Sequence, residues 1–255
     1  MSTVRVILGK EWASSLLTPR GLLLLAIQVV TMSVLAIVSL SLPDLSLMGQ
    51  AGLLKLLFQV AVALAVALAT LAASLTVAGE RDQATLESLL LAPISGTRLL
   101  GAKWLAAAGA GAVHLLLSLP YLIVMGAGTG LALWRVPAGL GLALLLMAGY
   151  TGVAVAASTI SGRTFSALVS TLVVAAVLEA PGFAAGALPK GALQKWLATI
   201  SPGDQVMTLA GNLLAGKGLS GLGTSWLTVA IFLAAVYLAV RYAAAHLELM
   251  GGDAQ

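Results

Sequence analysis

The chain of 255 residues has no cysteine and is poor in charged and aromatic residues. The absence of cysteine excludes disulfides, thiolate metal sites and thiol nucleophiles. Charged side chains make up 9% of the residues, against about 25% in an ordinary soluble domain. So little charge cannot cover a water-soluble fold in which 60% of the residues are hydrophobic and the mean hydropathy is +1.06. The composition therefore predicts an integral membrane protein.

Long apolar runs fill most of the chain. A helix needs about 20 apolar residues to cross the roughly 30 Å hydrocarbon layer. The runs predict six transmembrane helices, at residues 22–42, 54–79, 100–126, 138–161, 164–186 and 224–246. They are continuous, unlike the alternating strands of a membrane barrel. The sequence thus predicts an all-α integral membrane protein that forms a single transmembrane domain over residues 1–255.

The basic residues favour one orientation of these spans. With a cytoplasmic N-terminus, eight of the 13 Lys and Arg residues fall on the cytoplasmic side and five on the other side. The net charge of +4 is spread along the chain, whereas a nucleic-acid surface needs clustered basic residues, so we expect no nucleic-acid partner. We expect a multi-pass protein of the cell inner (cytoplasmic) membrane, in contact with the lipid bilayer, with both termini cytoplasmic.

Residues 1–20 have the pattern of an amphipathic helix that lies in the membrane interface. One stripe at helical spacing is apolar and comprises Val4, Ile7, Leu8, Trp12 and Leu16. Lys10 and Glu11 fall on the remaining faces, and Pro19 ends the helix. We therefore expect an N-terminal interfacial helix that contains Lys10, Glu11 and Trp12.

Residues 80–98, between the second and third spans, predict a second short helix on the cytoplasmic side. Leu86, Leu89 and Leu90 form an apolar stripe, Glu87 lies on another face, and Pro93 ends the helix. A solvated loop needs no such stripe, whereas a helix that docks into a groove of a soluble partner does. The alternative is a loop that only connects the two spans.

The run ERDQATLESLLLAPISGTRLLGAK, at 80–103, resembles the cytoplasmic segment of type-2 ABC exporter permeases (ABC-2 type transporter permeases, the transmembrane subunits). GKEW at 9–12 with TPRG at 18–21 is similar to the entry of that family, and ISPGDQ at 200–205 to its loop before the last span. Asp204 and Gln205 stand where many members have an aromatic residue or His, which leaves the substrate open.

The resemblance implies a half-transporter that pairs with a second permease subunit, either an identical chain or a close paralogue. It also implies two copies of a separate ABC ATP-binding subunit, which would hold ATP and Mg, so that this chain has no cofactor and is not itself an enzyme. The residues that would contact that subunit are Glu80, Arg81, Thr85, Leu86, Glu87, Leu89, Leu90 and Pro93. The apolar, uncharged spans suit a lipid, a drug-like amphiphile or a hydrophobic peptide as substrate.

Other functions have weaker support. Residues 211–218 fall short of a phosphate-binding loop, because Gly218 stands where Ser or Thr must reach Mg²⁺. A secondary transporter would place several ionisable groups at the membrane midplane, and this chain has almost none. A rhomboid-like protease would need Ser220 beside His246, at opposite ends of one predicted span. Two distant histidines give no pattern for a metal site.

Two features near the outer surface remain. Residues 187–221 are too apolar for a solvated linker and predict short re-entrant extracytoplasmic helices, divided at Pro202 and Gly203. Glu179 is the only acidic residue inside a predicted span, so it should find a partner. His114, Lys55 or an N–H freed beside Pro181 are candidates. We favour a structural hydrogen bond over a polar spot that lines the outer cavity.

Overall fold

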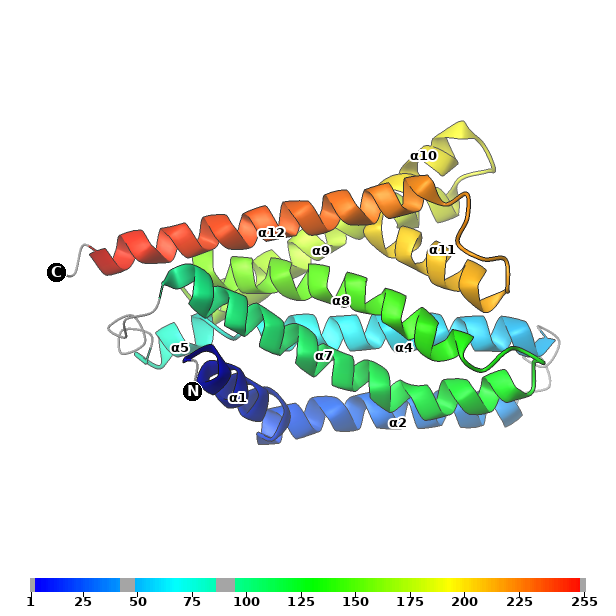
Figure 1. The fold of residues 1–255 in the computed structure, drawn as a ribbon, viewed down its shortest axis with the longest axis horizontal. Coiled ribbons are helices and arrows are strands. Elements are labelled where there is room, and N and C mark those ends of the chain that lie inside the picture. Colours follow the sequence, from blue (N-terminus) through cyan, green and yellow to red (C-terminus); the bar gives the residue numbers. More distant parts are fainter. Residues whose placement is uncertain (1–2, 42–48, 86–94, 253–255) are drawn as a thin grey trace.

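The computed structural model describes residues 3–41, 49–85 and 95–252, and every element within these ranges is a helix (Figure 1). The long helices are α2 (Pro19–Ser41), α4 (Gly49–Ser74), α7 (Gly96–Ala127), α8 (Arg135–Ile160), α9 (Thr164–Ala187) and α12 (Gly223–Gly252). In the described part of the chain, six helices are long and apolar enough to cross a membrane. The predicted all-α membrane fold with six spans is confirmed.

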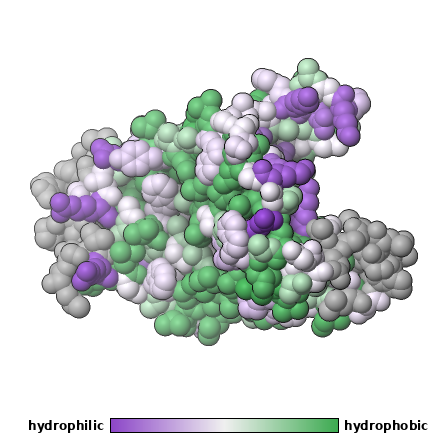
Figure 2. Space-filling model, turned by 45° about the vertical axis from the view of Figure 1, so that its right-hand side comes forward, coloured by the Kyte–Doolittle hydropathy of each residue, from purple (hydrophilic) through white to green (hydrophobic). Residues whose placement is uncertain are grey.

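The long helices lie along one direction, and the short helices gather at the two ends (Figure 1). One end, called the α1 end below, carries α1 (Thr3–Leu16), α5 (Ala78–Asp82) and the last turns of α12. The opposite end, called the α11 end, carries α10 (Ala192–Ile200) and α11 (Pro202–Leu214). Figure 2 shows a broad apolar region between hydrophilic residues that gather towards the two ends of the face in view. This distribution is that of a bundle that crosses a bilayer.

Helix α8 lies at the centre of the bundle, in contact with α4, α7, α9, α11 and α12. Its neighbours approach closely because α8 carries glycine at the contacts. A Cβ at Gly149 would collide with the Phe232 ring of α12, and one at Gly152 with Val236 and Trp104. Small residues that let helix backbones approach are typical of membrane bundles. Gly149 and Gly152 thus serve packing within the chain.

Candidate functional site

At the α1 end, α1 turns sharply into α2 through residues 18–21. The Thr18 hydroxyl donates to the Ser14 carbonyl at 2.7 Å and accepts the Gly21 N–H at 3.3 Å. Pro19 begins α2, where its missing N–H costs nothing. A Cβ at Gly21 would collide with the Ser15 carbonyl. The TPRG run is therefore a turn that folds α1 back beside the bundle.

Helix α1 packs against α7 instead of contacting only the membrane interface. Ile7 lies against Leu99 and Ala102 of α7. The Trp12 ring covers Gly109, where a Cβ would come within 2.7 Å of the Trp12 Nε1 atom. We expected Glu11 on a polar outer face, but the structure buries it against α7. The physical reason is a lysine on α7 that neutralises it.

That lysine is Lys103, and its side chain is fully buried. Its Nζ atom lies 2.7 Å from Glu11 Oε1 and 2.9 Å from Glu80 Oε2, and it donates to the Thr76 carbonyl at 3.1 Å. The side chains of Glu11 and Glu80 are only 9% and 16% exposed. Buried charges are tolerated when they are paired and hydrogen-bonded. We call Lys103, Glu11 and Glu80 the ionic junction, because they join α7, α1 and α5.

Lys10 completes the charge balance on the solvent side. Its Nζ atom lies 3.8 Å from Glu80 Oε1, and its side chain is 64% exposed. Such a long, exposed contact contributes little stability. Lys10 therefore forms a weak, exposed contact with Glu80, whereas Lys103 forms a close, buried ion pair with it.

Helix α5 is also attached on its other side, to the turn between α8 and α9. The Arg81 guanidinium donates to the Ser161 carbonyl and, at 3.2 Å, to the Thr159 carbonyl. Asp82 Oδ2 accepts the Thr164 N–H at 3.0 Å, at the first residue of α9. A carboxylate at a helix N-terminus satisfies a free N–H and the helix dipole. Helix α5 thus links α1 and α7 to α8 and α9.

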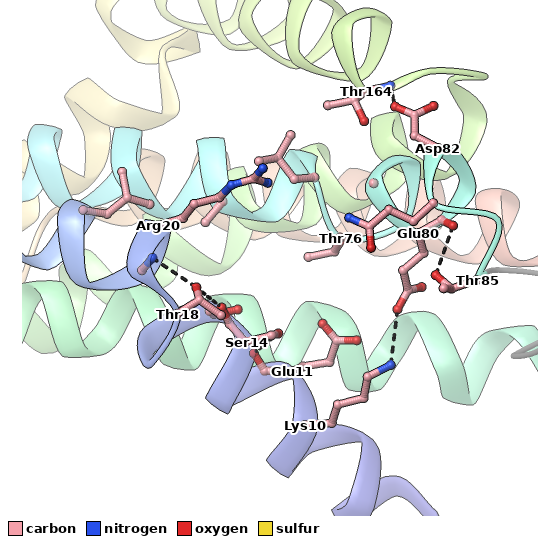
Figure 3. Close-up of a pocket in the computed structure, with 17 residues that line it drawn as sticks. Lys10, Glu11, Ser14, Thr18, Arg20, Thr76, Glu80, Asp82, Thr85 and Thr164 are labelled. Carbon is pink, nitrogen blue, oxygen red and sulfur yellow. Dashed lines mark hydrogen bonds and ion pairs between the residues drawn. The ribbon is translucent and has the colours of Figure 1, made fainter.

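These contacts surround a cavity of about 610 Å³, which we call the junction pocket (Figure 3). Its walls come from α1, the start of α2, the end of α4, α5 and the start of α9. Figure 3 shows Lys10 and Glu11 on one side, Arg20 on α2, and Glu80 and Asp82 on the opposite side. The pocket is therefore polar at the α1 end, and Glu11 and Glu80 of the ionic junction form part of its wall.

The residues predicted to contact an ATP-binding subunit have different positions. Glu80 and Arg81 are engaged within this chain, as described above. Thr85 is exposed, and its hydroxyl donates to the Glu80 carbonyl at 3.1 Å. The remaining members lie outside the described residues: Leu86, Glu87, Leu89, Leu90 and Pro93. Glu80, the first residue of the 80–98 segment, thus attaches that segment to α7 through its ion pair with Lys103.

A second polar site lies at the α11 end, around Glu179 of α9. Its carboxylate accepts the Tyr150 hydroxyl, the Ser201 hydroxyl at 2.6 Å and the Gly203 N–H at 3.0 Å. Ser201 Oγ also accepts the Asp204 N–H at 3.2 Å and so caps α11. A Cβ at Gly203 would collide with the Glu179 carboxylate. The ISPGDQ run therefore contains the start of α11, where the Gly203 N–H and the Ser201 hydroxyl donate to Glu179.

None of the three partners proposed from the sequence holds Glu179. His114 is buried in α7, and its Nδ1 atom has no hydrogen-bond partner among the described residues. Lys55 lines a separate cavity of about 490 Å³ between α4 and α11. Tyr150 and the start of α11 take this place because the packing of α8, α9 and α11 brings them together. The sequence predicted a division of residues 187–221 at Pro202 and Gly203; in the structure α10 ends at Ile200 and α11 begins at Pro202.

Catalytic alternatives gain no geometric support. Ser220 precedes α12 and His246 lies near its far end, so about 35 Å of helix separates them at 1.5 Å per residue. Across residues 3–41, 49–85 and 95–252, no three His, Asp or Glu side chains gather as they would to hold a metal ion.

The six long apolar helices and the two polar sites define a multi-pass α-helical membrane protein. Residues 5–247 match the family model described as ABC-2 family transporter protein. The chain belongs to this family, which makes it a membrane transport subunit and implies association with an ABC ATP-binding subunit. A comparison with curated proteins found no match.

Proposed function

We propose that this chain is the membrane-spanning subunit of an ATP-driven exporter and that it forms the translocation path as a dimer. Two separate ATP-binding subunits, which hold ATP and Mg²⁺, act on it at the α1 end. The observation that carries the proposal is the pairing of Glu80 with the buried Lys103, 2.9 Å apart. This pair ties the base of the 80–98 segment directly to the third span.

The coupling is mechanical in this proposal. Helices α5 and α7 flank residues 86–94 in sequence, and each of the two helices contacts other parts of the chain. Glu80 joins α5 to α7 and α1, while Arg81 and Asp82 join it to α8 and α9. Packed and paired elements move between discrete arrangements and do not deform continuously. A displacement of the 80–98 segment is therefore passed to at least four helices.

The charges support the assignment of the α1 end to the cytoplasm. Arg5, Lys10, Arg20, Arg81 and Arg98 belong to α1, α5 and the starts of α2 and α7. An excess of Lys and Arg is typical of the cytoplasmic side. The α11 end then faces the outside of the inner membrane.

The least buried spans, α2 and α9, supply surface for lipid and for a second permease subunit. On α9, Phe165, Val177 and Phe183 are exposed. The spans carry almost no charge, which suits a lipid, a drug-like amphiphile or a hydrophobic peptide as substrate.

The first test is co-purification. The chain is extracted from its native membrane in mild detergent, and the bound proteins are identified and counted. We expect an ATP-binding subunit in a 1:1 ratio, with two copies of each chain in the complex. A stable preparation without any ATP-binding chain would contradict the proposal.

The second test is the coupling itself. Leu86→Asp should abolish the ATPase activity of the reconstituted complex that substrate stimulates, and leave the amount of protein in the membrane unchanged. Leu133→Asp is the matched control, because Leu133 is an exposed leucine between α7 and α8 at the opposite end. Full stimulated ATPase activity in the Leu86→Asp variant would exclude residues 80–98 as the coupling segment.

A further inference from the structure

The junction pocket extends from the polar end of the bundle into its apolar part. Leu24 of α2 and Ala72 and Leu75 at the end of α4 line one part of it. Leu24 lies about 7 Å along α2 from Pro19, at 1.5 Å per residue. A site with charged walls at one side and apolar walls at the other fits an amphiphile and not a small hydrophilic ion.

The acidic side chains of the pocket are already engaged. Lys103 holds Glu11 and Glu80 at 2.7 and 2.9 Å. Asp82 accepts the Thr164 N–H at 3.0 Å. The acids are therefore not available to bind a cationic ligand without loss of these contacts.

Hydrogen-bond donors remain open in the same pocket. In the part of the chain that the structure describes, the Arg20 guanidinium, the Ser15 hydroxyl and the Gln83 amide make no hydrogen bond or ion pair. An Arg guanidinium matches the geometry of phosphate oxygens and can bind two of them at once. The open donors thus favour an anionic group, with phosphate the best match.

We propose that the junction pocket binds one anionic phospholipid. Its phosphodiester group contacts Arg20 and Ser15, and its acyl chains lie along Leu24, Ala72 and Leu75. The bilayer supplies such a ligand at this depth, because Arg20 is the second residue of a membrane-spanning helix. Anionic lipid surfaces attract basic side chains next to a span. The lipid would bridge α1 and α2 to the end of α4, beside the ionic junction.

This inference does not rest on the proposed function, because binding is measured on this chain without ATP or a partner. The full chain is stripped of lipid in detergent and titrated with phosphatidylglycerol, phosphatidylcholine or glycerol 3-phosphate. Native mass spectrometry counts the bound molecules, and thermal unfolding reports stabilisation, since a ligand that binds the folded state raises the unfolding temperature. We expect one tightly held phosphatidylglycerol and weaker binding of the other two compounds.

The variants separate the two parts of the site. Arg20→Gln should weaken phosphatidylglycerol binding by about tenfold or more, the effect of losing a charge-assisted hydrogen bond. Leu24→Trp should also weaken it, because the larger ring fills the apolar part while Arg20 remains. Arg98→Gln is the control: Arg98 is exposed at the same end on α7 and does not line the pocket.

Four results would overturn the proposal. Unchanged binding in Arg20→Gln would show that the lipid binds elsewhere, and equal binding of phosphatidylcholine would exclude an anionic site. Equally tight binding of glycerol 3-phosphate would show a soluble phosphate site. Loss of the lipid when an ATP-binding subunit is added would assign the pocket to a protein partner.

Discussion

The two ends of the molecule each place a carboxylate away from water and satisfy it in opposite ways. At the α1 end, Glu11 is neutralised by the positive charge of Lys103, 2.7 Å away. At the α11 end, Glu179 has only neutral donors: two hydroxyls and the Gly203 N–H at the start of α11. One carboxylate is held by an ion pair, and the other by hydrogen bonds and a helix N-terminus.

The difference has a consequence for how firmly each short helix is held. The ionic junction joins three elements through one lysine. Removal of Lys103 therefore leaves Glu11 without a counter-charge and leaves Glu80 only the long contact to the exposed Lys10. The Glu179 site joins α9 to α8 and α11 through separate donors, so each contact can be lost alone. We therefore expect that loss of Lys103 disrupts all contacts of the ionic junction together, whereas the hydrogen bonds of Glu179 can be lost one at a time.

The largest effect should come from Lys103→Met. Removing one partner of a buried ion pair costs about 3–5 kcal/mol, because an uncompensated charge stays buried. The free energy of unfolding in detergent measures this loss. The double variant Lys103→Met with Glu11→Gln should recover part of it. If the double variant is no more stable than the single one, Glu11 and Lys103 do not stabilise each other as the distance implies.

The second effect concerns Glu179. Glu179→Leu leaves the Gly203 N–H and two hydroxyls without their acceptor, which costs about 1–3 kcal/mol for a buried group. Trypsin cleavage at Lys195, on α10 next to this site, should become faster. Glu179→Gln keeps an acceptor and should be milder, with assembly and transport intact. Intact assembly with lost transport in Glu179→Gln would instead place Glu179 in the substrate path.

The third effect tests whether packing also holds α1. Gly109→Ala places a Cβ within 2.7 Å of Trp12 Nε1, and overpacking costs about 1–3 kcal/mol. Gly101→Ala on the same helix is the control, because a Cβ there meets nothing within 4 Å. Cross-linking between cysteines introduced at Ile7 and Leu99 reports the distance of α1 from α7. Equal cross-linking in both variants would mean that the ionic junction alone holds α1.

The smallest effect is a pH dependence at the α11 end. Burial, and next the charge of Glu179, raise the pKa of Asp204 above its ordinary value. The folded state therefore binds this proton more tightly than the unfolded state, and stability falls as the pH rises from the ordinary to the raised pKa. Asp204→Asn should flatten this slope in thermal unfolding curves. An unchanged slope would show that Asp204 is not responsible.

The sequence predicted much of the fold because membrane insertion depends on local properties. Length and hydropathy suffice to locate a span, since the backbone must satisfy its own hydrogen bonds in lipid. Pro202 and Gly203 likewise predicted a break in residues 187–221, because their effect on a helix is local. The partner of Glu179 was missed, since Tyr150 and Gly203 lie far from it in sequence and carry no charge to mark them.

The sequence marked Glu11 and Glu80 as candidate residues but did not predict that they pair with Lys103. Lys10 and Glu11 were assigned to the remaining faces of an interfacial helix, and Lys103 entered only as the last residue of the run at 80–103. A signal was present: Lys103 lies inside the predicted third span, 100–126, where an unpaired lysine would be costly. The sequence could not identify the partner of Lys103, because several acidic residues lie near the cytoplasmic ends of the predicted spans.

The sequence by itself determined which segments lie in lipid, as six spans, and which lie at the ends of the spans. It also identified the family that the run at 80–103 resembles. Only the tertiary structure decided which charges meet. Pairing of Lys103 with Glu11 and Glu80, and of Glu179 with the start of α11, depends on the crossing of helices far apart in the chain. The reason is physical: hydropathy acts residue by residue, whereas an ion pair needs two atoms within about 4 Å, which packing alone provides.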